Sequence, residues 1–200
     1  GIQELDDGMR FHVSGFHHEF ELFVPALGRH MVYNALAGTA VGLALGLTLR
    51  EIQAGIEALK PVSGRNHLIH TEKWDILDDC YNANPSSMRA SVGNFLAEPL
   101  EERQRRVLIL GDMLELGDWS EREHAAIIEM AAQDPEAELL LVGPEFAKAY
   151  DGLAEKPANV TLCPTRDDLI SLLKVSPVEH SLVLVKGSHG MGLEQALEAL

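Results

Sequence analysis

The stretch Trp74–Met88 reads WDILDDCYNANPSSM, and the rest of the chain is interpreted from it. Its first four residues predict a short buried strand, which ends in two aspartates and a polar turn. Asn84 then precedes Pro85, a pair that suits the N-cap and the first position of a helix. The stretch therefore predicts a strand, a turn and a helix, the unit from which α/β sheets are built.

Ligands of open α/β sheets bind at the carboxyl ends of strands, where this turn would lie. A helix that begins there directs its free N–H groups at the turn and favours an anion. A structural unit with ordinary caps and no ligand is the alternative that the spacing leaves open.

Composition excludes several classes of protein. The chain has 200 residues, 46% of them hydrophobic and 24% charged, as expected for a globular protein with a real core. Its net charge of -15 comes from 16 basic and 31 acidic residues, which argues against nucleic acid or an anionic membrane surface as the main partner. The longest apolar run, near Ala35–Leu49, is broken by glycines and too short to span a bilayer, so we expect no membrane insertion.

The two cysteines, Cys80 and Cys163, are far apart and outside any metal-ligand spacing. A reduced cytoplasmic compartment is the simplest explanation, and we expect no metal site in this chain. The chain opens with Gly1 inside a strand-like pattern, which suggests a piece of a longer protein.

The first part of the chain combines strands with two helices. Residues 2–24 alternate in short runs that predict antiparallel hairpins. Helices are expected from about His30 to Leu45 and, after a capping box at Thr48–Glu51, to about Leu59. Asn34 lies among apolar neighbours in the first helix, where the residues alone favour a core position over a ligand contact.

A change of composition at Pro61–Gly64 predicts a hinge between a domain of residues 1–60 and one of residues 61–200. Beyond it, apolar strands alternate with capped helices, and several runs are apolar on both faces, as in a parallel sheet covered on each side. This second part is predicted to be a doubly wound, mostly parallel α/β domain. The strands expected are Trp74–Leu77, Arg106–Leu110, Glu138–Val142, Val160–Cys163 and Leu182–Val185, with a possible extra strand at Asn66–His70. The helices expected are Pro85–Glu98, Glu121–Gln133, Pro144–Tyr150, Arg166–Leu173 and Leu193–Leu200, with caps at Ser120 and Thr165.

Polar residues gather after three of these strands, at Asp79–Asn84, Gly111–Gly117 and Lys186–Gly192. The carboxyl ends of parallel strands share one edge of a sheet, so the three loops can converge on one cleft. Lys186 could there meet a carboxylate or a phosphate, or be a solvated lysine at the sheet edge.

Two nucleotide motifs are not found. The last loop spaces its glycines as G-x-x-G-x-G, which is not the dinucleotide fingerprint, and no P-loop occurs in the chain. Asp112, Glu115 and His124 could be imagined as metal ligands. We favour a structural or hydrogen-bonding role for His124, because it lies beyond the capped start of the next helix.

Five blocks of sequence together resemble the Mur ligases. The turn block and the block L-G-D-M-x-E-L-G are the most specific, and the resemblance runs from about residue 20 to the end. The blocks are Gly28–Ala37, Ser63–Arg65, Asp79–Met88, Leu110–Gly117 and Val185–Ser188.

The resemblance implies a bacterial, cytoplasmic enzyme of peptidoglycan synthesis that has three domains and acts as a monomer. ATP would activate the carboxylate of UDP-N-acetylmuramoyl-tripeptide as an acyl phosphate, and the amine of D-alanyl-D-alanine would attack it. Residues 1–60 would be the end of the central ATP-binding domain, and residues 61–200 the C-terminal domain with a Rossmann-like sheet. The P-loop and the Mg²⁺ ligands would lie outside this chain, which should be inactive alone.

The resemblance also assigns roles to residues of the nucleotide site. Asn34 would contact the adenine, which reverses the core interpretation given above. Arg65 would reach the phosphates, and Asp79 would accept hydrogen bonds from the ribose. These three side chains are therefore expected to bind ATP, with Arg65 also catalytic.

Further roles fall on the turn and the last loop. Tyr81, Asn82 and Asn84 would line the nucleotide and the reacting centre, with Asn82 catalytic. Lys186 and Ser188 would approach the dipeptide, and Lys186 would take part in catalysis.

Two other functions stay open at this point. One is a non-catalytic α/β module that binds a nucleotide or a partner. The other is a different ligase of the same type, such as another muramoyl ligase or a folylpolyglutamate synthase. A G-x-x-G-K-[ST] loop upstream of residue 1 would favour a ligase over a module.

Overall fold

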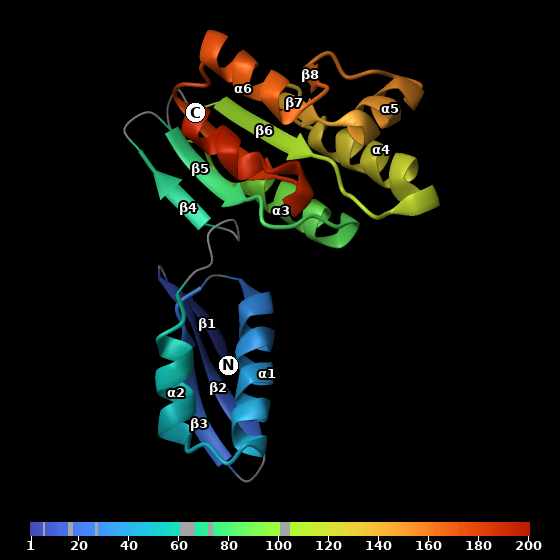
Figure 1. The fold of residues 1–200 in the computed structure, drawn as a ribbon. Coiled ribbons are helices and arrows are strands. Elements are labelled where there is room, and N and C mark those ends of the chain that lie inside the picture. The colour runs from blue at the N-terminus through green and yellow to red at the C-terminus, as the bar shows by residue number, and fades with distance from the viewer. Residues whose placement is uncertain (6, 16–17, 27, 61–66, 72–73, 101–104) are drawn as a thin grey trace. The chain divides into compact units, whose positions relative to one another are not determined.

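A computed structural model describes residues 1–200 except 6, 16–17, 27, 61–66, 72–73 and 101–104 (Figure 1). The chain divides into two compact units, Gly1–Pro61 and Val62–Leu200, and each is described by itself. The predicted hinge and Arg65 lie outside the described residues.

The first unit is an antiparallel sheet with two helices. The strands β1 (Ile2–Leu5), β2 (Gly8–Gly15) and β3 (His18–Val24) pair in chain order, which confirms the predicted hairpins. The helices are α1 (Arg29–Ala44) and α2 (Leu49–Glu57). Alternate residues of β2 and β3 form the core with α1, as a strand period of two requires; these residues are Met9, Phe11, Leu22, Val24, Val32 and Ala35.

The predicted cap of α2 is present. Thr48 Oγ1 accepts from the Glu51 backbone N–H, and the Glu51 carboxylate accepts in return from the Thr48 backbone N–H at 2.8 Å. This capping box confirms the start of the helix that the sequence predicted.

The second unit is built on a sheet of six strands in the order β4-β5-β9-β6-β7-β8. Five of these strands run parallel, and β4 pairs antiparallel with β5 at one edge. The predicted doubly wound, mostly parallel sheet is confirmed. The strands are β4 (His67–His70), β5 (Trp74–Asp79), β6 (Arg105–Gly111), β7 (Glu138–Val142), β8 (Val160–Cys163) and β9 (Ser181–Lys186).

Helices cover both faces of this sheet (Figure 1). One face packs against α3 (Pro85–Ala97), α4 (Ser120–Ala131) and α5 (Pro144–Gly152). The other packs against α6 (Arg166–Val175) and the 3₁₀ helix η3 (Leu193–Ala199). Successive residues of a strand serve opposite faces: in β6, Leu108 and Leu110 join the first core, and Val107 and Ile109 the second.

Two expectations about helices were wrong. The last segment is a 3₁₀ helix and not an α-helix. Ser120 is the first residue of α4 and not its cap, because its hydroxyl donates to the carboxylate of Glu145 instead. A short 3₁₀ turn, η1 (Gly117–Trp119), leads into α4. The cap predicted at Thr165 is confirmed, with Thr165 Oγ1 accepting from the Asp168 backbone N–H.

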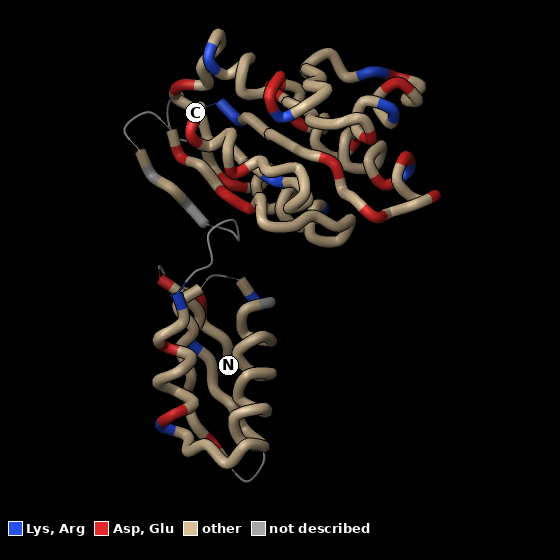
Figure 2. Tube along the Cα trace, in the orientation of Figure 1, with Lys and Arg blue, Asp and Glu red and all other residues tan. Residues whose placement is uncertain are grey.

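The distribution of charge and the length of the helices describe the surface of the chain. Figure 2 shows Lys and Arg scattered among more numerous Asp and Glu over the described chain. Within that part of the chain, no helix combines the length and the apolar character needed to cross a membrane.

Candidate functional site

The three loops that the sequence predicted to converge do meet in the second unit. They follow β5, β9 and β6, which are neighbours in the sheet. Ser188 joins all of them: its backbone N–H donates to Asp112 O at 3.1 Å, and its hydroxyl accepts from Leu114 N–H at 2.9 Å. The same hydroxyl donates to Ala83 O at 3.4 Å, so one buried serine links the three strand ends.

Lys186 ends β9 and is only 1% exposed. Its ammonium donates to Asp79 Oδ2 at 2.6 Å and to Asn82 O at 3.1 Å. The Ser91 hydroxyl donates to the same Oδ2 at 2.6 Å. Lys186 is thus not a solvated edge lysine but part of a buried network with the turn that follows β5.

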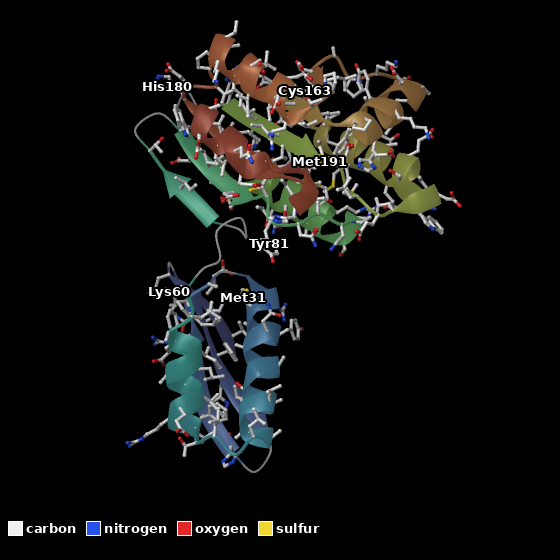
Figure 3. The ribbon with its side chains drawn as sticks, in the orientation of Figure 1. Met31, Lys60, Tyr81, Cys163, His180 and Met191 are labelled. Carbon is white, nitrogen blue, oxygen red and sulfur yellow. The ribbon has the colours of Figure 1, made fainter. Side chains whose placement is uncertain are left out.

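Three polar side chains of that turn are exposed beside the network: Tyr81, Asn82 and Asn84. Tyr81 is 41% exposed and projects from the turn (Figure 3). Its ring lies 5.6 Å from that of His189, measured between centroids. Asn82 Oδ1 accepts from the Ala83 backbone N–H at 2.9 Å, which stabilises the turn locally.

Asn84 caps α3 as predicted. Its Oδ1 accepts from Ser87 N–H at 2.9 Å, and Ser87 Oγ accepts from Asn84 N–H at 3.1 Å, with Pro85 at the first helical position. The start of α3 also forms one wall of an open groove of about 560 Å³. The groove is lined by Asn84, Pro85, Ser86, Arg89, Glu115, Leu116, Trp119 and Glu123.

Charged side chains are held in place along this groove. Glu123 accepts from the guanidinium groups of Arg122 and Arg89, and these hydrogen bonds hold its pKa below the usual range. The Arg122 guanidinium also lies 4.3 Å from the centre of the Trp119 ring. The groove therefore presents an ion-paired wall beside an aromatic face.

Asp112 and His124 have structural partners. The Asp112 carboxylate accepts from the N–H groups of Glu145 and Phe146 at 3.0 and 2.9 Å, at the start of α5. Burial raises the pKa of this carboxyl, and the two N–H groups oppose the shift. His124 Nε2 accepts from Met113 N–H at 2.9 Å, and Nδ1 lies 2.7 Å from Ser120 O, which confirms the expected hydrogen-bonding role.

A metal site is not built from the described part of the chain. No group of three or more His, Cys, Asp or Glu side chains among those residues is arranged to hold a metal ion. Asp112 and His124 are committed to backbone groups, as shown above, so they are poor candidates for ligands.

Asn34 lies in the first unit and is exposed on α1. Its amide donates to Met31 Sδ at 3.6 Å, and Met31 is labelled in Figure 3. The core position favoured from the residues alone was wrong. An exposed amide is accessible to a ligand. The adenine contact that the family resemblance implies for Asn34 stays a prediction.

Sequence reasoning did not single out Ser91 or Gly187. Ser91 has no local signal, because only the docking of α3 brings it to Asp79. At Gly187 the signal is the glycine itself, directly after a strand. A Cβ there would lie 3.1 Å from Gly111 Cα, so glycine permits the ends of β9 and β6 to approach.

Known proteins match this chain along its length. A family model described as "Mur ligase, glutamate ligase domain" matches residues 64–189. A UDP-N-acetylmuramoyl-tripeptide–D-alanyl-D-alanine ligase of Bacillus subtilis is 32% identical over 202 residues, covering 100% of this chain and 43% of the relative. The enzyme of that name from Escherichia coli is 36% identical over 183 residues, covering 90% of this chain and 39% of the relative.

Solved structures agree in fold. MurF from Acinetobacter baumannii superposes with a TM-score of 0.79 at 29% identity, covering 98% of this chain and 43% of that one. MurF from Thermotoga maritima in complex with ADP superposes with a TM-score of 0.70 at 21% identity, covering 100% of this chain and 44% of that one. The chain spans less than half the length of each of these relatives.

Proposed function

The chain belongs to the Mur ligase family, and we propose that it is part of an enzyme that joins D-alanyl-D-alanine to UDP-N-acetylmuramoyl-tripeptide in peptidoglycan synthesis. Members of the family are ATP-dependent ligases. The observation that carries the proposal is the convergence of three loops on Ser188, beside the buried pair of Asp79 and Lys186. All of this chain aligns with part of the Bacillus subtilis ligase.

The reaction sets the requirements for the site. When bound, ATP supplies the phosphoryl group that activates the tripeptide carboxylate for attack by the dipeptide amine. The residues of this chain then have to orient two substrates and exclude water, because an acyl phosphate hydrolyses readily. We propose that residues 1–60 are the end of the central ATP-binding domain and residues 61–200 the C-terminal domain.

Asp79 fits a nucleotide ribose better than a phosphate. Lys186 and Ser91 both donate to Oδ2, so the carboxylate is held as a charged acceptor. An ionised carboxylate accepts hydrogen bonds from hydroxyl groups and repels phosphates. Asp79 is therefore proposed to bind the ribose hydroxyls.

Other residues take the remaining parts of the nucleotide. Asn34, exposed on α1, is proposed to contact the adenine, and Arg65 the phosphates. Tyr81, Asn82 and Asn84 are proposed to line the nucleotide and the reacting centre. Mg²⁺ is proposed to be held by residues outside this chain.

Ser188 is proposed as a residue on the side of the dipeptide, together with the loops that it joins. We further propose that the protein acts as a monomer in the bacterial cytoplasm. The acceptor can be checked directly: ligation should require D-alanyl-D-alanine, and equal activity with L-glutamate would favour a folylpolyglutamate synthase or another muramoyl ligase instead.

The nucleotide site is tested in the full-length protein that contains this chain. Asp79→Ala should lower kcat/KM for ATP roughly 10- to 100-fold, because a charged hydrogen-bond acceptor is lost. Arg65→Ala should have an effect of similar size on the same constant. Phosphate release in the presence of both substrates measures the rate.

Asp151→Ala is the matched control, since Asp151 is an exposed aspartate on α5 that pairs only with Lys156 among the described contacts. Its kcat/KM should match that of the unchanged enzyme. Unaltered kinetics in folded Asp79→Ala and Arg65→Ala variants would reject the site assignment, and absence of ligation by the unchanged enzyme would reject the function.

A further inference from the structure

Lys186 is among the largest fully buried side chains of the chain. A lysine is almost never buried this completely unless its charge is paired. It lies opposite Asp79 in the register of β9 and β5, so the parallel pairing of two neighbouring strands brings the ammonium to the carboxylate. The pair is a consequence of sheet register and not of a flexible surface contact.

Three elements converge on a single oxygen of Asp79. Oδ2 receives Lys186 Nζ from β9 and Ser91 Oγ from α3, each at 2.6 Å, and Asp79 itself ends β5. Two donors on one oxygen hold a carboxylate in position more firmly than one donor would, and a donor that is charged makes the stronger bond. The side chain of Asp79 keeps 14% exposure, so the oriented group still reaches the surface.

The same ammonium fixes the turn. Lys186 Nζ donates to Asn82 O at 3.1 Å, in the segment that carries Tyr81 and Asn84. Lys186 itself cannot shift easily, because Gly187 lies against Gly111 and Ser188 is bonded to Asp112 and Leu114. Lys186 therefore has a fixed position, and its two hydrogen bonds orient Asp79 and the turn.

We propose that Lys186 is a positioning residue of the ligase, which acts on the nucleotide side through Asp79 and Asn82 and does not touch the dipeptide. The inference rests on the proposed function, because it takes Asp79 to bind the nucleotide. Direct contact with the dipeptide, the role first expected for Lys186, would require the ammonium to leave a pair that is almost fully buried. Leaving it would separate two paired charges in a buried site, which is costly.

Separate KM values for the two substrates test the inference in the full-length enzyme. Lys186→Met keeps the length of the side chain and removes its charge and donors. It should raise KM for ATP about tenfold, because Asp79 loses its orientation, and change KM for D-alanyl-D-alanine by less than about twofold. Ser91→Ala, which removes a second donor to Oδ2, should raise the same KM for ATP by a smaller factor.

A double-mutant cycle shows whether Lys186 acts through Asp79. In the Asp79→Ala background, Lys186→Met should add less than about a twofold change in KM for ATP, because the group that it orients is already gone. Lys148→Met is the matched control, since Lys148 is an exposed lysine that pairs with Glu121 on the surface. It should change neither KM.

Each other outcome overturns the inference. A selective rise in KM for the dipeptide would show direct contact, and independent, multiplicative effects in the cycle would show that Lys186 does not act through Asp79. Lower thermal stability of Lys186→Met with both KM values unchanged would show that Lys186 only stabilises the fold. If Lys186→Met does not fold, an unchanged KM for ATP in Ser91→Ala overturns the inference. If Asp79→Ala leaves kcat/KM for ATP unaltered, both the nucleotide role of Asp79 and the inference about Lys186 are rejected.

Discussion

Asp79 is the last residue of β5 and Asp112 directly follows β6, at the same edge of the sheet. The two carboxylates differ in their partners and in their exposure. Asp79 faces an ammonium and a hydroxyl and retains surface access. Asp112 is fully buried, and its carboxylate accepts two backbone N–H groups at the start of α5. It lies so close to Gly143 that a Cβ there would be 2.3 Å from its oxygen. One aspartate is available to a ligand, and the other joins strand to helix.

The two cysteines offer a test at this scale. Burial raises the pKa of both thiols, and for Cys80 a hydrogen bond to Asp78 adds to the shift. A raised pKa leaves less thiolate at pH 8, and the thiolate is the nucleophile. We expect both thiols of the folded protein to react slowly with an aromatic disulfide reagent, and both to react rapidly in denaturing urea. Cys163→Ser isolates Cys80, and a native rate equal to the denatured rate would contradict the burial described here.

Helix starts show how local signals compete with tertiary contacts. The caps of α2, α3 and α6 formed as the sequence predicted, because a cap and its partner lie within one turn of chain. Ser120 had the same local signal but lost its cap to Glu145, which α5 brings within reach. A neighbouring element thus decides whether a polar side chain serves its own helix.

The cap of α3 can be separated from any ligand role of Asn84. Asn84→Ala removes the acceptor for Ser87 N–H and should cost about 1 kcal/mol of unfolding free energy. Asn84→Asp keeps an acceptor and should be close to the unchanged protein. Urea unfolding followed by tryptophan fluorescence measures both. Equal stability of all three proteins would show that the cap contributes nothing.

The molecule consists of two units with separate cores. The core of Gly1–Pro61 is formed by β2, β3 and α1, whereas two further clusters cover the faces of the sheet in Val62–Leu200. Each unit has the hydrophobic interior that an independently folding domain needs. That residues 1–60 are the end of a central domain and residues 61–200 a C-terminal domain stays a proposal.

Independent folding of the second unit is therefore expected. Both tryptophans, Trp74 and Trp119, belong to it, so their fluorescence reports this unit alone. A polypeptide of residues 62–200 should unfold cooperatively in urea, with a fluorescence midpoint close to that of the whole chain. Far-UV circular dichroism of the whole chain, which also reports the first unit, serves as the comparison. An unfolded fragment, or a midpoint well below that of the whole chain, would contradict independence.

Local patterns in the sequence determined most of the fold. Apolar runs, glycine and proline positions and capping residues predicted the hairpins, the covered parallel sheet and the three loops at its edge, because each depends on residues close together in the chain. The blocks of sequence that resemble the Mur ligases then pointed to Asp79 and Lys186 as site residues.

Tertiary structure alone decided which side chains those residues contact. Lys186 and Asp79 are 107 positions apart, and they meet only because β9 inserts between β5 and β6. Ser91 reaches the same oxygen through the docking of α3. Strand order and helix docking are set by the fit of the whole core, which no local pattern encodes, and they bring a lysine expected at a substrate to the carboxylate of Asp79.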